Sequence, residues 1–207
     1  MNDKIMLGLV VLAGFIGTSA AAPALAQALE SFLVIEKAEV SANGELEATL
    51  TTEGVIPTDG DEGAFSYGIL TDDGDAILVS TTHAGVLDSE EQDYILDPVW
   101  HNHFVRLGEV PECGEDQGIV DITWQSPGHV EINGDIASIS GVPTDEFQGW
   151  HSITGEDLSM TLGQDVSNVV SFRLDPVFDE QAGLQAVCVT DITAAEDIDV
   201  NSMAQPQ

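Results

Sequence analysis

Short runs of apolar and β-branched residues alternate with tight-turn signals along this chain, and this alternation most limits the folds it can adopt. The Asn-Gly pairs at 43–44 and 133–134 each separate two such runs, and Asn-Gly readily adopts the positive φ angles of a tight hairpin. Asp72-Asp73-Gly74-Asp75 separates a third pair. No long stretch repeats apolar residues with the period of a helix. The sequence therefore predicts an all-β protein.

The pattern also predicts how the strands are organised. Several short strands at close spacing favour a single-domain antiparallel β-sandwich or jelly roll, which we place over residues 27–193. An acidic, polar tail follows over 194–207. The expected strands are 32–40, 45–52, 66–70, 76–82, 99–107, 119–124, 129–132, 135–139, 169–174 and 184–192.

Residues 1–26 have the three parts of a signal peptide. Lys4 precedes an almost wholly apolar run over 5–16, and small residues lead to Ala24-Leu25-Ala26, a sequence that signal peptidase recognises. The apolar run is short for a retained anchor, so we expect no membrane span after processing. The leader predicts export, with the mature protein secreted to the periplasm, the cell surface or the extracellular medium.

Acidic residues dominate the charge. Thirty-seven acidic residues against four basic ones give a net charge of −33. Such a surface repels phosphate backbones, so we expect no nucleic-acid partner. It attracts cations or cationic partners, and it also keeps a protein soluble in a saline medium.

Two cysteines, Cys113 and Cys188, lie in the predicted mature chain. An even number of cysteines in an exported domain favours a disulfide, and no C-x-x-C spacing suggests metal thiolates. In the chain-entropy picture, a loop of this length stabilises the fold by about 4 kcal/mol.

Two histidines are the strongest candidates for chemistry. His101 and His103 fall one residue apart in a predicted strand, where side chains alternate between faces, so both should point the same way. Two imidazoles on one rigid face can bind a transition metal such as Zn or Cu. Further ligands could come from the remaining histidines or nearby acids: His83, His129, His151, Asp97 and Glu109. The alternative is two half-buried sheet histidines that hydrogen-bond to backbone or carboxylate groups.

The stretch over 101–133 partly resembles the metal-binding motifs of the cupins, a jelly-roll family. His101, His103, Glu109 and Gly114 follow the order of the first cupin motif, and Pro127-Gly128-His129 with Asn133 follows the second. The resemblance implies a divalent metal bound by His101, His103, Glu109 and His129, often at the centre of an enzyme.

Other chemistry is less well supported. The acidic turns at 59–62 and 72–75 are similar to fragments of calcium loops, but neither continues to the distant glutamate of an EF-hand, and turn formation also explains them. No G-x-S-x-G or G-x-G-x-x-G motif is present, so neither a nucleophile elbow nor a dinucleotide site is indicated.

These observations lead to one expectation and two alternatives. We expect an exported acidic β-sandwich protein with a non-catalytic binding or structural role. The main alternative is a metal-binding protein or a cupin-like metalloenzyme that uses His101 and His103. Assembly into surface filaments through the first predicted strand is the other.

Overall fold

The computed structural model describes residues 30–181 and 183–200, and within them it is all-β. Two short 3₁₀ helices, η1 (Ser31–Leu33) and η2 (Pro111–Cys113), are the only helices in this part of the chain. The strands are β1 (Ile35–Asn43), β2 (Glu45–Thr52), β3 (Phe65–Thr71), β4 (Ile77–Thr82), β5 (His101–Glu109), β6 (Gln117–Ile122), β7 (His129–Asn133), β8 (Ile136–Pro143), β9 (Glu146–Trp150), β10 (Asp157–Thr161), β11 (Val166–Phe178), β12 (Leu184–Ala194) and β13 (Ile198–Val200). The all-β prediction is confirmed.

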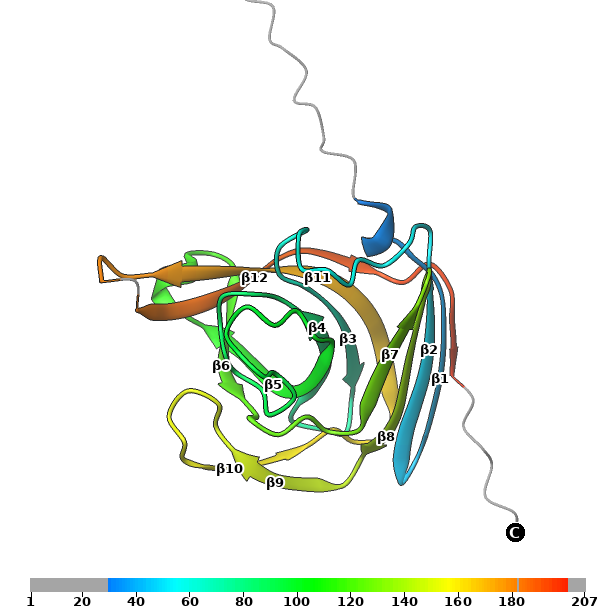
Figure 1. Cartoon of the computed structure of the whole chain (residues 1–207). Helices are drawn as coiled ribbons and strands as arrows, with labels where there is room; N and C mark the ends of the chain where they lie inside the picture. The colour runs from blue at the N-terminus through cyan, green and yellow to red at the C-terminus, as the bar shows by residue number, and fades with distance from the viewer. Residues whose placement is uncertain (1–29, 182, 201–207) are drawn as a thin grey trace, which may run out of the picture.

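Six strands close into an antiparallel barrel in the order β11-β12-β6-β5-β4-β3 (Figure 1). The long strand β11 closes it, because β11 pairs with β12 along one edge and with β3 along the other. The β11–β3 pairing joins residues as far apart in sequence as Phe172 and Ser66. A closed barrel has no free sheet edge within it.

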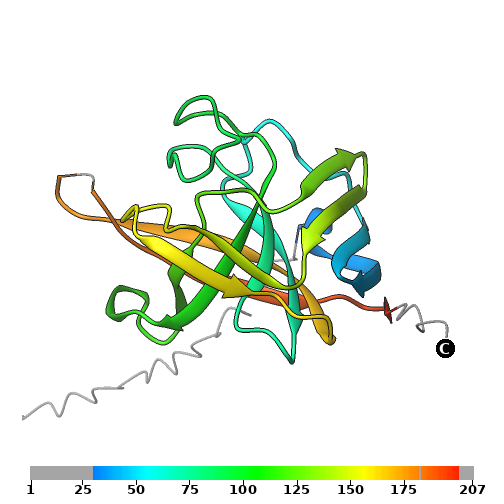
Figure 2. The same cartoon turned by 90° about the horizontal axis from the view of Figure 1, so that it is seen from below.

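A second sheet, β13-β1-β2-β8-β7, lies beside the barrel, while β9 and β10 form a separate hairpin (Figures 1 and 2). Each predicted Asn-Gly turn joins neighbouring strands of this sheet. Gly44 between β1 and β2 has φ +78°, and Gly134 between β7 and β8 has φ +68°. The predicted hairpin at 72–75 joins β3 to β4. The three hairpins are therefore confirmed.

The hydrophobic core has two main parts. The larger part lies between the barrel wall and the second sheet, where Phe65, Tyr67 and Trp100 pack with Leu46 and Ile139. The other part is formed by Val79, Val105, Ile122, Phe172 and Val189, which the barrel strands contribute, and it lines the barrel interior. The fold thus differs from two open sheets because one sheet curls and closes on itself.

The predicted segments at the chain ends fall mostly outside the described residues. The signal peptide at 1–26 and residues 201–207 lie beyond them. Within the predicted tail, Ile198–Val200 form β13, which pairs in parallel with β1. No helix among the described residues has the length and apolar character needed to cross a bilayer.

The predicted disulfide is confirmed. Cys113 in η2 is bonded to Cys188 in β12, with their Cα atoms 5.4 Å apart. The bond ties the segment between β5 and β6 to the barrel wall. A disulfide of this kind fits an oxidising compartment.

Candidate metal site

Three histidines from neighbouring barrel strands meet inside one end of the barrel. His101 and His103 lie on the same face of β5, and their rings are 4.8 Å apart. His83 directly follows β4, the strand that pairs with β5, and its ring lies 5.0 Å from that of His101. All three side chains are buried. The structure therefore confirms the prediction from strand alternation that His101 and His103 share one face of their strand.

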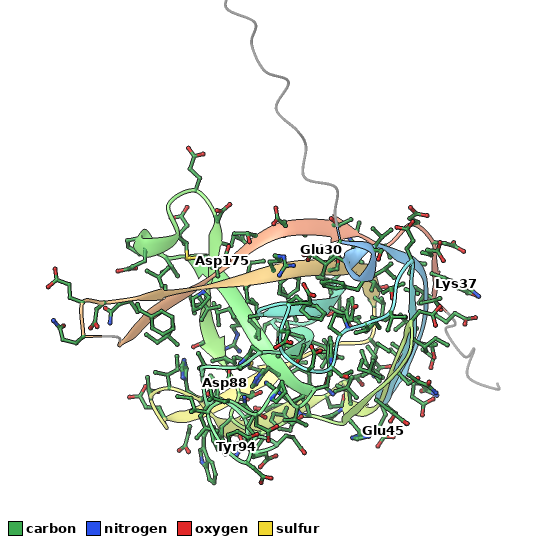
Figure 3. The ribbon with its side chains drawn as sticks, turned by 45° about the horizontal axis from the view of Figure 1, so that its top comes forward. Glu30, Lys37, Glu45, Asp88, Tyr94 and Asp175 are labelled. Carbon is green, nitrogen blue, oxygen red and sulfur yellow. A yellow bond between two sulfur atoms is a disulfide. The ribbon has the colours of Figure 1, made fainter. Side chains whose placement is uncertain are left out.

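The fourth member, Asp88, comes from the loop between β4 and β5. Gln92 holds this loop in shape: its Oε1 accepts hydrogen bonds from the amides of Asp88 and Ser89 at 3.0 and 3.3 Å, and its Nε2 donates to the carbonyl of Val86. The Asp88 carbonyl also accepts a hydrogen bond from Ser152. Figure 3 shows Asp88 and Tyr94 at the same loop-rich end of the molecule, where Tyr94 is exposed. The loop thus presents the Asp88 carboxylate to the histidines.

The four side chains converge on one point. Asp88 Oδ1 lies 3.3 Å from Nε2 of His83, 3.5 Å from Nε2 of His101 and 3.7 Å from Nε2 of His103. Each residue offers a ligand atom, and these four atoms all lie within 4.8 Å of one another. Ligands at about 2.0–2.1 Å from a tetrahedral metal are separated by about 3.3–3.4 Å. The observed separations are close to that spacing.

The backbone fixes the orientation of two of the rings. Nδ1 of His101 lies 2.8 Å from the carbonyl oxygen of Val99, and Nδ1 of His103 lies 2.6 Å from that of Thr123. A carbonyl oxygen can only accept a hydrogen bond, so we assign the proton of each neutral ring to Nδ1. The lone pair of each ring then lies on Nε2, directed at the cluster. Metal-binding histidines are commonly oriented by a hydrogen bond of this kind.

The electrostatics of the cluster favour an ionised carboxylate beside a neutral His101 ring. Burial acts to raise the pKa of Asp88, but electrostatic attraction to His103 and the polar contacts with His101, His103 and His83 outweigh it, so the pKa of Asp88 lies well below its ordinary value. Burial lowers the pKa of His101, although Asp88 acts to raise it, so this imidazole is kept neutral. With its Nδ1 proton bonded to the carbonyl of Val99, the His101 ring directs its Nε2 lone pair toward the Asp88 carboxylate. A metal ion at this point would supply positive charge to the carboxylate.

Hydrogen bonding within the described residues leaves the same atoms without partners. Asp88 Oδ1, His101 Nε2 and His103 Nε2 are buried and make no hydrogen bond, and the same holds for His83 Nδ1. Each buried polar group without a partner costs about 1–3 kcal/mol. Three of these four atoms are potential metal ligands, so coordination would relieve most of this cost.

The metal site predicted from the sequence also included Glu109 and His129. Neither residue belongs to the cluster around Asp88. Glu109 is exposed at the far end of β5, and His129 is exposed on β7 in the second sheet. The structure therefore brings His101 and His103 together with His83 and Asp88, and it leaves Glu109 and His129 on the surface.

The acidic turn at 72–75 has a structural use. The Asp73 carboxylate accepts hydrogen bonds from the amides of Gln164 and Asp165, and Asp75 binds the amide of Thr161 and the side chain of Arg106.

Within the described residues, the cluster around Asp88 is the one group of three or more His, Cys, Asp or Glu side chains arranged to hold a metal.

His83 was recognisable from sequence as one of a few histidines, but Asp88 was not. The carboxylate lies in a loop rich in acids, in a chain with 37 acidic residues, and no spacing distinguishes it. The position of the Asp88 carboxylate depends on the path of the loop, which no local sequence pattern predicts.

Comparison with protein-family models, with curated proteins and with solved structures gives no match. The partial resemblance to cupins thus gains no support from a family model. The case for the site depends on its geometry.

Proposed function

We propose that this protein binds one divalent transition-metal ion through His83, Asp88, His101 and His103. The observation that carries the proposal is the convergence of three buried imidazole rings and one carboxylate, in which Asp88 Oδ1, His101 Nε2 and His103 Nε2 have no hydrogen-bond partner. The metal-binding alternative from the sequence is therefore preferred over a purely structural role for the histidines.

The donor set limits which metal fits. Imidazole nitrogen suits Zn, Cu, Fe and Ni, and a carboxylate suits each of them as a fourth ligand. Calcium takes oxygen ligands, so a set of three imidazoles argues against it. The separations of 3.3–3.7 Å between Asp88 Oδ1 and the three Nε2 atoms suit a tetrahedral ion such as Zn²⁺.

The setting of the proposed site is an exported, acidic protein with a binding role. The predicted leader and the Cys113–Cys188 disulfide support export to the periplasm, the cell surface or the extracellular medium. The net charge of −33 raises the local concentration of cations around the protein. Both features favour capture of a metal outside the cytoplasm.

Elemental analysis tests the proposal directly. The mature protein, purified without chelator or histidine tag and dialysed against Zn²⁺, is expected to hold about one metal ion per chain. The His101→Ala/His103→Ala variant is expected to hold none, because two of the four ligands are gone.

A matched control replaces the two exposed residues that the sequence suggested. The Glu109→Ala/His129→Ala variant is expected to retain the metal, because neither side chain reaches the cluster. Equal metal content in wild-type protein and the His101→Ala/His103→Ala variant, with both folded by circular dichroism, would refute the proposal.

A further inference from the structure

An apolar cavity adjoins the metal cluster inside the barrel. Its volume is about 110 Å³, and its wall includes the inward-facing side chains of five barrel strands, among them Val79, Val105, Ile122, Leu174 and Val187. His83, Asp88 and His103 form part of the same wall. A metal held by the cluster would thus border the cavity directly.

The cavity offers few other polar groups. Thr81 and Gln185 are the remaining polar side chains among the described residues of its wall. The Thr81 hydroxyl donates to the carbonyl of Phe65, and the Gln185 amide donates to the carboxylate of Asp179. Both already have partners. A ligand in the cavity would therefore find its polar anchor at the metal.

The size of the cavity and the net charge of the protein limit further which molecules can bind there. An apolar cavity of about 150 Å³ is known to hold benzene, so about 110 Å³ admits a short alkyl chain or part of a small ring. The net charge of −33 opposes the approach of anions. A neutral molecule fits both limits.

We propose that the barrel cavity binds a small neutral molecule with an apolar body and one donor atom, and that this donor coordinates the metal. The inference rests on the proposed metal site and adds the class of its ligand. A four-coordinate metal can accept such a donor by expanding to five ligands. His101 lies outside the cavity wall, so the entering donor approaches from the side of His83, Asp88 and His103.

Cobalt substitution makes the inference measurable, because the visible absorbance of protein-bound Co²⁺ changes when its coordination changes. The Co²⁺-loaded protein is titrated with 1-propylimidazole and with 1-(2-hydroxyethyl)imidazole, which have the same donor and tails of three heavy atoms. We expect the propyl compound to bind at least tenfold more tightly, because the hydroxyl of the other compound would lose its hydrogen bonds to water and find no free partner in the apolar wall. Equal affinities would overturn the inference.

A variant that fills the cavity tests whether 1-propylimidazole binds inside it. Val79→Phe adds volume at a residue that lines the cavity and is not a ligand, so it should weaken 1-propylimidazole at least tenfold while leaving Co²⁺ binding unchanged. Val55→Phe, at a residue 72% exposed and outside the cavity, is the matched control and should change neither. Should Val79→Phe fail to fold, Ile153→Trp blocks the cavity from an exposed loop instead.

The outcomes separate the two proposals. Failure of Co²⁺ to bind, with the protein folded, refutes the metal site and the inference with it. Co²⁺ binding without a preference for the propyl tail, or with affinity unaffected by the cavity-filling variant, refutes the inference alone.

Discussion

Two polar clusters lie along the same barrel strand, and they are built in opposite ways. Near the start of β5, His101 and His103 meet Asp88 in a buried group whose facing atoms lack hydrogen bonds. Further along, Arg106 binds Asp121 at 3.1 Å, Asp75 at 2.5 Å and the carbonyl of Ser159 at 2.7 Å. The second cluster is partly exposed and its charges are paired within the protein.

The difference shows which of the two clusters has its charges balanced by the protein alone. Arg106 brings positive charge to two carboxylates, so this cluster needs nothing more. The cluster around Asp88 has donors of electron pairs and no permanent cation. Val79, Val105 and Ile119 line both the cavity beside Asp88 and a second hollow beside Arg106, so the two clusters border opposite ends of one interior.

The largest effect is expected when the metal cluster loses its only carboxylate. Asp88→Asn keeps the side-chain volume but removes the charge, and we expect the Kd for Zn²⁺ to rise at least about 100-fold. Competition with a chromophoric chelator measures it. Arg106→Ala is the control and should leave the Kd unchanged; an equal loss in both variants would mean that general destabilisation, and not ligation, is being measured.

The second-largest effect on the Kd for Zn²⁺ is expected from a change in the loop that carries Asp88. Gln92→Ala removes the hydrogen bonds to the Asp88 and Ser89 amides without touching a ligand. We expect the Kd for Zn²⁺ to rise about tenfold, because the carboxylate is no longer held in place. The unfolding free energy of the metal-free protein should fall less than that of the zinc-loaded protein. A Gln92→Ala variant with wild-type affinity would show that the loop is positioned by other contacts.

A smaller effect is expected at the Arg106 cluster. Arg106→Ala leaves the Asp75 and Asp121 carboxylates without their cation, and urea denaturation should show a loss of about 1 kcal/mol, limited by solvent screening. This loss should be the same with and without Zn²⁺, in contrast to the two variants above. A zinc-dependent loss would mean that the clusters are coupled through the barrel.

The smallest effect depends on pH. Partial burial acts to raise the pKa of Asp75, but the Thr161 amide and Arg106 lower it overall. A lowered pKa in the folded state means that the contribution to stability is complete above about pH 4 and is lost as the pH falls further. Between pH 5 and 3, wild-type protein should therefore lose more unfolding free energy than Arg106→Ala, by less than about 0.5 kcal/mol because Asp75 is exposed. Parallel pH profiles would contradict this.

The comparison also shows what sequence patterns can predict. His101 and His103 were found because strand alternation is a local rule, and the three hairpins were found because Asn-Gly and Asp-Gly turns are local too. Closure of the barrel depends on β11 meeting β3 across about 100 residues of chain, and no turn signal encodes a contact of that range. Most strands were therefore predictable, but β9, β10 and β13 were not predicted, and neither was the closure of the barrel.

The same limit applies to the metal site. Of the four proposed ligands, the sequence predicts His101 and His103 as a set and His83 as one of several candidates, and it does not indicate Asp88. A carboxylate that reaches its site through a loop held by Gln92 has no periodicity to detect. Glu109 was suggested instead because it follows His103 in sequence, although it ends β5 on the surface.

The parallel pairing of β13 with β1 has a consequence for the order of events during synthesis. Ala38, Glu39 and Val40 of β1 lie opposite residues 198–200 of β13. One edge of the first long strand therefore stays open until nearly the whole described chain has been made. During that interval the edge can pair with a second chain, so a chaperone that covers nascent strands would protect it. Pairing with β13 then covers this edge of β1.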